Sequence, residues 1–172
     1  NIVIRNCTIK RGHNLLAIGS ELSGGVRNVY MHDVDYQPTG GLTISLLYIK
    51  TNHRRGGVVE NIFIENAAAT EVSTAMLAID TDVLYQWRDL VRTVDMKHTV
   101  IRRIVMENVK LGKAEHGIYI NGSKERPVEQ ILLKNVRVDN VTKEPRVLRN
   151  VEELREENVV IGDNRLLPAS NV

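Results

Sequence analysis

A short repeating pattern of polar and apolar residues constrains the fold of this chain more than any other feature. In each unit a polar residue opens a run in which apolar residues alternate with others, and an Asn or Asp closes it. The units occupy residues 1–6, 28–33, 61–66, 103–108, 130–135 and 158–163. Their closing residues follow one another at intervals of 27, 33, 42, 27 and 28 positions. Such a unit predicts a β-strand that is too short to bury itself, so the units must stack on one another.

Three repeat architectures have intervals in this range. A leucine-rich repeat needs a regular Leu framework and a helix or its equivalent in each unit, and neither is visible here. A propeller blade needs about 40 residues and four antiparallel strands. One coil of a parallel β-helix matches the shortest intervals, and its turns can accept insertions. We therefore expect one all-β domain over residues 1–172, a right-handed parallel β-helix of about six coils.

The alternation predicts which side chains face the interior and which stack at a bend. The closing residues are expected to hydrogen-bond to one another along the axis of the solenoid. The expected inward residues are Ile2, Ile4, Val29, Met31, Ile62, Ile64, Ile104, Met106, Ile131, Leu133, Val159 and Ile161. The expected bend residues are Asn6, Asp33, Asn66, Asn108, Asn135 and Asp163.

A second strand can be aligned independently in four of the coils. The segments are 16–19, 47–50, 77–80 and 118–121, at offsets of 31, 30 and 41 residues. Alternation puts two columns on the outer face, the first containing Ala17, Tyr48, Ala78 and Tyr119, and the second Gly19, Lys50, Asp80 and Asn121. Neighbouring coils lie about 4.8 Å apart, so Lys50 should lie beside Asp80.

The offset of 41 residues locates an insertion at residues 81–99. Its apolar residues recur at helical spacing, which predicts a protruding loop with at least one helical turn. The loop is either a cap over one side of the solenoid or one wall of a binding cleft, and the residues alone favour the cap. Another helical turn is expected at residues 151–157, before the last strand.

Composition excludes several classes of protein. The net charge of +2 is too small to indicate binding to nucleic acid or to a membrane. No apolar run approaches the roughly 20 residues of a membrane-spanning helix. The single cysteine, Cys7, cannot form an internal disulfide and is expected to be a small buried side chain. The chain begins at Asn1 inside the apolar pattern, so we interpret it as a piece of a longer protein.

Two segments carry a resemblance to a known family. Gly12 and His13 precede an Ile-Gly-Ser segment, and Ile49 and Lys50 follow about one coil later. Their order and spacing resemble the Gly-His-Gly and Arg-Ile-Lys elements of glycoside hydrolase family 28, the polygalacturonases. The Gly-Ser-Glu-x-Ser-Gly-Gly run at residues 19–25 is similar to bacterial members in particular, and residues 118–136 are similar to the C-terminal coils of the family.

The resemblance implies a secreted or periplasmic enzyme that hydrolyses galacturonate-containing bonds of pectic polysaccharides with inversion. It implies an acidic polysaccharide or oligosaccharide as the binding partner, and no cofactor. His13 would tune the protonation of the catalytic acid, and Lys50 would hold a substrate carboxylate. The sequence departs from the family at Asn14, where the family has Gly, and at Tyr48, where it has Arg. Losing that Arg removes a bidentate partner for a carboxylate, although Tyr48 could stack on a sugar ring or donate a hydrogen bond.

We therefore predict that His13 and Lys50 are catalytic and that Tyr48, Asn52 and Arg54 bind substrate. Each assignment has a structural alternative. His13 could be an ordinary turn histidine, and Lys50 could form a surface ion pair with the neighbouring Asp80, which would add little to stability. The basic run at residues 53–55 could attract an acidic polysaccharide or be a solvated turn.

The catalytic aspartates of the family have no counterpart in this chain. Inverting hydrolysis needs one carboxylic acid to protonate the leaving oxygen and one carboxylate to activate water. In the family these precede the Gly-His element, and Asp80 and Glu21 do not match them. We therefore expect the acid and base upstream of this chain, which alone should be inactive.

Two other functions remain open from the sequence. A non-catalytic, carbohydrate-binding or structural β-helix would need none of the upstream aspartates. A calcium-dependent polysaccharide lyase shares the architecture, but no cluster of residues has convincing metal-ligand spacing, which argues against it. We expect no metal site.

Overall fold

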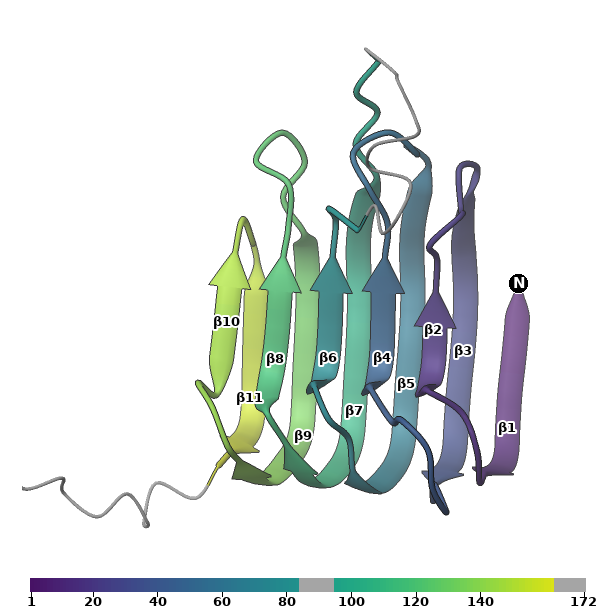
Figure 1. Ribbon diagram of the computed structural model, residues 1–172, viewed down its shortest axis with the longest axis vertical. Helices are drawn as coiled ribbons and strands as arrows, with labels where there is room; N and C mark the ends of the chain where they lie inside the picture. The colour runs from purple at the N-terminus through teal and green to yellow at the C-terminus, as the bar shows by residue number, and fades with distance from the viewer. Residues whose placement is uncertain (84–94, 163–172) are drawn as a thin grey trace, which may run out of the picture.

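The computed structural model describes residues 1–83 and 95–162. Within these residues the chain forms eleven β-strands and no helix (Figure 1). Six strands are long, and these are β1 (Ile2–Ile9), β3 (Gly25–Tyr36), β5 (Val58–Glu71), β7 (Val100–Ala114), β9 (Glu129–Val141) and β11 (Leu154–Ile161). Five are shorter and alternate with them along the chain, namely β2 (Asn14–Ile18), β4 (Ser45–Lys50), β6 (Ala75–Asp80), β8 (His116–Asn121) and β10 (Arg146–Arg149).

The strands form two parallel sheets. The long strands pair in the order β1-β3-β5-β7-β9-β11, and the short strands pair in the order β10-β8-β6-β4-β2. Consecutive strands therefore lie in opposite sheets. In Figure 1 the short strands run upward in front and the long strands run downward behind, while the chain advances from β1 towards β11. This winding is a right-handed parallel β-helix, which confirms the predicted fold class.

Asparagine and aspartate side chains mark one corner of every coil. These residues have φ angles of 52–54°, in the left-handed region, and they are Asn6, Asp33, Asn66, Asn108, Asn135 and Asn158. Most residues with a Cβ avoid this region, whereas Asn and Asp tolerate it. The Nδ2 atom of Asn66 donates to Asp33 at 2.9 Å, and the contacts from Asn108 to Asn66 and from Asn135 to Asn108 measure 3.0 and 3.1 Å. The predicted stack of bend residues is therefore present, and we call it the closing ladder.

The last coil corrects the predicted phase. Asn158 was expected to open the final unit, but its Nδ2 atom donates to Asn135 at 3.0 Å, so Asn158 closes it. Consistently, Leu154 pairs with Ile131 and Val159 with Val136. The predicted phase of this unit is thus wrong by five positions, and Asp163 lies outside the described residues. The helical turn expected at residues 151–157 is also wrong, because β11 begins within it at Leu154.

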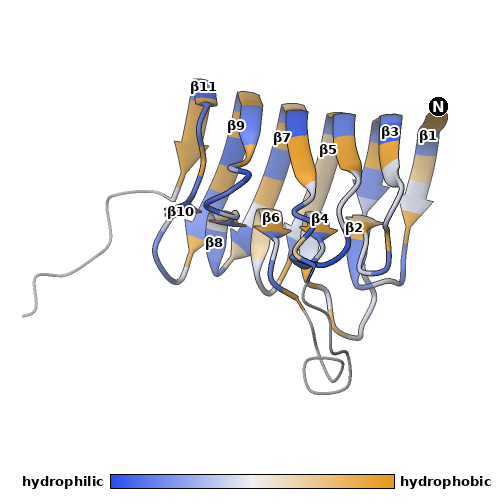
Figure 2. Ribbon diagram, turned by 90° about the horizontal axis from the view of Figure 1, so that it is seen from above, coloured by the Kyte–Doolittle hydropathy of each residue, from blue (hydrophilic) through white to orange (hydrophobic). Residues whose placement is uncertain are grey.

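The inner coils bury their predicted core side chains. Eight of them have at most 2% of their surface exposed, namely Val29, Met31, Ile62, Ile64, Ile104, Met106, Ile131 and Leu133. Ile161 is buried and Val159 is partly buried against the core. Figure 2 shows the alternation of hydrophobic and hydrophilic residues along the long strands. This alternation makes the space between the two sheets a continuous aliphatic core.

The first coil differs from the inner coils because β1 is the edge strand of its sheet. Ile2 is 50% exposed and Ile4 is only partly buried, although both occupy core columns. Cys7 pairs with the buried Val34, yet it is exposed, so the predicted buried thiol is wrong. The pattern places Cys7 correctly in an inward column, but a side chain at the edge has a neighbouring strand on one side only.

The second alignment is confirmed pair by pair. Tyr48 pairs with Ala78, which pairs with Tyr119, and Lys50 pairs with Asp80, which pairs with Asn121. Ala78 nevertheless is 1% exposed, although its column faces outward. The tyrosine neighbours on both sides account for this burial.

Residues 81–99, where the changed offset predicts an insertion, connect β6, which ends at Asp80, to β7, which begins at Val100. The helical turn expected within residues 81–99 falls mainly on residues 84–94, which lie outside the described residues.

Candidate functional site

Tyr48 and Lys50 lie on the outer face of the short-strand sheet. Their neighbours Leu47 and Ile49 are fully buried, so alternation directs Tyr48 and Lys50 away from the core. The Nζ atom of Lys50 lies 5.5 Å from the centroid of the Tyr48 ring, within the range of a cation–π interaction. The aromatic ring therefore helps to hold the ammonium group on this face.

Asp80 occupies the next position in the Lys50 column. Its Oδ1 atom accepts a hydrogen bond from Asn121 Nδ2 at 3.1 Å and another from the backbone N–H of Asp82 at 3.0 Å. These two bonds fix the orientation of the carboxylate. The outer face thus presents a cation, an anion and an amide at successive coils.

Gly19 ends the same column in the first coil. Its φ angle is 109°, and a Cβ atom at this position would overlap the backbone carbonyl of Lys50. Only glycine allows this close approach without displacement. The main chain of the first coil therefore packs directly against the backbone of Lys50.

The turn after β4 carries the other two predicted substrate-binding residues. Asn52 is only 6% exposed, and its Oδ1 atom accepts from the backbone N–H of Arg54 at 3.0 Å. This is a side-chain-stabilised turn, in which Asn replaces a backbone acceptor. Arg54 is partly exposed at the tip of the turn. Asn52 consequently shapes the turn, and Arg54 is the member of the pair whose side chain reaches solvent.

His13 lies at the opposite end of the short strands. It is exposed, and its backbone carbonyl accepts from the N–H of Ile44 at 2.5 Å. The register of Asn14 with Ser45 puts His13 level with Ile44, six residues before Lys50. At about 3.3 Å per residue the separation along the strands is up to roughly 20 Å. The structure therefore groups Tyr48, Lys50 and the turn residues, and it places His13 apart from them.

A polar cluster that the sequence does not reveal adjoins this turn. The rings of His53 and His98 lie 4.7 Å apart between centroids, and Ser123 Oγ lies 2.8 Å from His98 Nδ1. Ser123 Oγ also donates to Glu125 at 2.8 Å. This hydroxyl, a backbone N–H and the two histidines lower the pKa of Glu125.

The members of this cluster come from three different coils, so no local motif connects them. The members lie in turns that are far apart in the sequence, and only the stacking of the coils brings them together. The cluster extends the polar edge that begins at Arg54, with groups that can donate to and accept from hydroxyls.

No group of three or more His, Cys, Asp or Glu side chains in the described ranges is arranged to hold a metal ion. The same part of the chain contains no helix long and apolar enough to cross a membrane.

A parallel β-helix with a polar outer face is a scaffold that many functions share, so the fold alone does not decide among them. The sequence profile of the family "Glycosyl hydrolases family 28" matches residues 1–158, which is most of the chain. The chain therefore belongs to glycosyl hydrolase family 28.

A solved structure agrees with this assignment. The hyperthermoactive exopolygalacturonase from Thermotoga maritima is 30% identical in sequence and superposes with a TM-score of 0.78. The match covers 94% of this chain and 34% of the exopolygalacturonase chain. The chain thus corresponds to about a third of that enzyme.

One curated protein also has a similar sequence. It is the small ribosomal subunit protein uS2 of Ehrlichia chaffeensis (strain ATCC CRL-10679 / Arkansas), 28% identical over 130 residues, which are 73% of this chain and 45% of that protein. The chain spans less than half the length of this relative. The family profile and the solved structure cover more of the chain and agree with each other, so the assignment rests on them.

Proposed function

We propose that this chain contributes to the inverting hydrolysis of galacturonate-containing glycosidic bonds in pectic polysaccharides. The aspartates that act as acid and base lie outside it. Family membership supports the reaction class. The observation that carries the role of this chain is the Lys50 ammonium beside Tyr48 on the exposed face of β4.

Lys50 supplies a point charge for the carboxylate of a galacturonate residue. Tyr48 replaces the second cation of the family motif, and its ring can also pack against the apolar face of a sugar. Arg54 adds a guanidinium at the edge, where it can form paired hydrogen bonds to a carboxylate. Asn52 supports this arrangement by holding the turn that carries Arg54.

His13 has a separate role in the proposal. Its distance from Lys50 along the strands means that both cannot contact the same carboxylate. We assign His13 to a different sugar residue of the bound chain, the one at the scissile bond, where it adjusts the protonation of the catalytic acid. The acid protonates the leaving oxygen while the base activates water on the opposite face of the ring.

We further propose that the enzyme acts outside the cytoplasm, in the periplasm or after secretion, as its family resemblance suggests. Pectic polysaccharides are cell-wall polymers that are too large to enter a cell intact.

Replacing Lys50 tests the binding role. Lys50→Ala should weaken the binding of trigalacturonate to the chain about tenfold, because the main cation for the sugar carboxylate is lost. The free energy of unfolding should change by less than about 0.5 kcal/mol, as expected for an exposed side chain. Isothermal titration calorimetry and urea unfolding measure the two effects. Lys110→Ala is a matched control on the other sheet, and unchanged affinity in Lys50→Ala would sink the assignment.

A product assay separates the proposed hydrolysis from other reactions. The protein that includes the upstream aspartates should release reducing ends from polygalacturonate with inverted configuration. Unsaturated products that absorb ultraviolet light and require calcium would indicate a lyase instead, and binding without turnover would indicate a non-catalytic protein. Reducing ends released by the 172-residue chain alone would contradict the placement of the acid and base outside it.

A further inference from the structure

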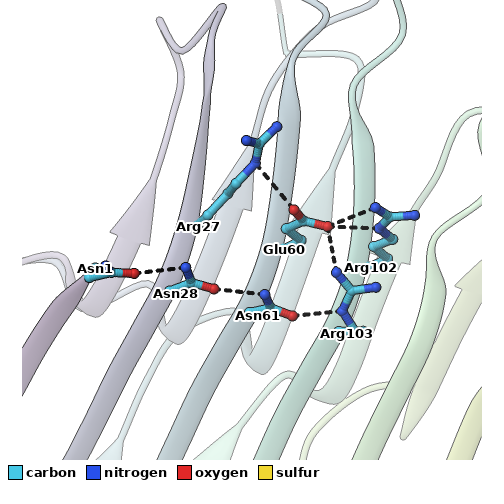
Figure 3. A network of polar contacts seen from close by, with 7 residues as sticks. All are labelled: Asn1, Arg27, Asn28, Glu60, Asn61, Arg102 and Arg103. Atoms are coloured by element: carbon cyan, nitrogen blue, oxygen red, sulfur yellow. Dashed lines mark hydrogen bonds and ion pairs between the residues drawn. The ribbon is translucent and has the colours of Figure 1, made fainter.

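Three arginines surround one glutamate at the start of the long strands (Figure 3). Glu60 on β5 accepts from Arg27 Nε at 3.2 Å, from Arg102 at 2.9 Å and from Arg103 at 2.6 Å. The arginines come from β3 and β7, the strands on either side of β5. One carboxylate cannot neutralise three guanidinium groups, so these four side chains, which we call the arginine network, carry a net charge of +2, with Glu129 on β9 as the register neighbour of Arg102.

The three arginine side chains of the network are more exposed to solvent than the glutamate that they surround. The side chain of Glu60 is 12% exposed, whereas those of Arg27, Arg102 and Arg103 are 57%, 39% and 41% exposed. The hydrogen bond from Arg102 and the charges of all three arginines lower the pKa of Glu60. Glu60 therefore stays ionised in mildly acidic solution, and the surface that faces solvent is cationic there.

Arg103 departs from the repeat of the chain itself. In the preceding coils the same corner is occupied by Asn1, Asn28 and Asn61, joined by hydrogen bonds of 2.7 Å. Arg103 continues this ladder through its Nε atom, which lies 2.6 Å from Asn61 Oδ1. Its φ angle is 54°, a conformation that asparagine adopts at less cost than arginine. An Asn would serve the ladder, so what Arg103 adds is the cation.

A shallow hollow adjoins Arg103. It has a volume of about 350 Å³, with Phe63, Val105 and Leu132 in its lining and Glu153 and Arg155 among its polar members. This size lies within the range of small-ligand sites. An apolar floor beside a guanidinium suits a ligand that combines a flat apolar face with a carboxylate, and a uronic acid has both.

The network also lies close along the chain to the proposed substrate site. The turn that carries Arg54 ends at Gly57, and β5 begins with Val58, two residues before Glu60. The turn that carries Arg54 thus leads from the face of β4 into the strand that holds Glu60, the centre of the network.

We infer that Arg27, Arg102 and Arg103, with the adjoining hollow, form a second binding site for a polyuronate chain, separate from the face of β4. The identity of the polymer rests on the proposed function. Guanidinium groups bind carboxylates in a planar, paired geometry. A polymer that occupies both sites gains affinity because the second contact is intramolecular.

Ligand length provides the test. The double variant R102Q/R103N should bind a galacturonate decamer about tenfold more weakly than the wild-type chain at low ionic strength. It should bind trigalacturonate with unchanged affinity, because a trimer fills the face of β4 alone. The wild-type preference for the decamer should shrink as salt is added, since screening weakens exposed charge pairs. Calorimetry gives these affinities, and thermal unfolding checks that the variants are folded.

The control removes the same charge elsewhere. K110Q/R137Q takes two cations from the long-strand sheet beyond the closing ladder, and its affinity for the decamer should stay within about twofold of wild type. If R102Q/R103N is unstable, R103N alone can replace it, because it introduces the asparagine that the repeat has at this corner. Its preference for the decamer over the trimer should still be smaller than that of the wild type.

Several results would overturn the inference. One is an unchanged affinity of R102Q/R103N for the decamer. Another is a loss of decamer affinity in K110Q/R137Q as large as that in R102Q/R103N. A third is a loss of trimer affinity in R102Q/R103N as large as its loss of decamer affinity. Binding of a fully methyl-esterified decamer with the same dependence on Arg102 and Arg103 would exclude carboxylate recognition, and an equal dependence for a DNA oligonucleotide would exclude a uronate site. Failure of the proposed function gives a different result. In that case Lys50→Ala would bind the trimer with unchanged affinity, whether or not R102Q/R103N affects binding of the decamer.

Discussion

The two corners of the long strands follow different rules. At one corner the closing ladder contains only Asn and Asp through all six coils, and the contacts between coils measure 2.9–3.1 Å from Asp33 to Asn158. At the other corner the run of asparagines stops after Asn61, and Arg103 and Gln130 take the next two positions in the same left-handed conformation.

The difference separates what the fold requires from what it merely permits. The closing corner keeps an Asn or Asp in all six coils, which indicates that it requires a side chain that tolerates the left-handed conformation. A ladder that accepts Arg103 shows that the second corner tolerates other residues, provided that the hydrogen bond to the neighbouring coil is kept. The charge that enters at this corner is then available for binding.

The largest effect on stability is expected at the closing ladder. Asn66→Ala should lower the free energy of unfolding by about 2 kcal/mol, because alanine is strained at positive φ and two hydrogen bonds to neighbouring coils are lost. Asn66→Gly removes the hydrogen bonds without the steric strain and should cost about 1 kcal/mol. Urea unfolding measures both. An equal loss in the two variants would show that backbone conformation contributes nothing at this corner.

An intermediate and pH-dependent effect is expected at Glu60. Its pKa is lowered in the folded protein, so its ionised form stabilises the fold above the ordinary glutamate pKa, and this stabilisation is lost as the pH falls through the lowered value. Glu60→Gln should therefore melt below wild type at neutral pH, and the two melting temperatures should converge in strong acid. The exposed Glu152→Gln is the control, with little difference at any pH. A difference in melting temperature between Glu60→Gln and wild type that widens as the pH falls would contradict this explanation.

The smallest effect on stability is expected at Arg103, in the second corner. Arg103→Asn should change the free energy of unfolding by less than about 0.5 kcal/mol, since asparagine restores the ladder of the preceding coils while an exposed charge contact is lost. Arg103→Ala, which removes the ladder contact as well, should cost about 1 kcal/mol. Urea denaturation curves of Arg103→Asn and Arg103→Ala measure these changes in the free energy of unfolding. A larger loss in the Asn variant than in the Ala variant would contradict the ladder role assigned to this position.

The sequence predicts the fold well because its alternation of apolar residues depends directly on which side chains face the core. Alternation reports which side chains are buried, and residues such as Met31 and Ile64 obey it wherever a coil has neighbours on both sides. Where a coil has one neighbour only, as at Ile2 and Cys7, the alternation still reports direction but no longer reports burial.

The errors in the last coil have a similar explanation. An asparagine in the left-handed conformation can open or close a unit, and nothing local distinguishes the two corners. The sequence pattern therefore places Asn158 at the wrong corner, and the pairing of Leu154 with Ile131 shows the correct one.

The candidate site is less accessible to sequence reasoning. Lys50 beside Asp80 follows from the offset of the strands, so it can be predicted. The contact between His98 and Ser123 joins residues from different coils at turns of unequal length, and no periodicity encodes it. The gathering of Arg27 and Arg102 around Glu60 does follow from the repeat, because the three residues are register partners on neighbouring strands.

The unequal spacing of the closing ladder has a consequence for how such a protein can change over time. Successive contacts in the ladder span 33, 42, 27 and 23 residues, yet in each an Asn Nδ2 donates to the Oδ1 atom of the preceding coil. A gene insertion or deletion in a turn between the strands can therefore leave the stacking of the coils unchanged. Lineages that carry this scaffold can reshape the walls around a sugar chain by gaining or losing turn segments, without any compensating mutation in the interior.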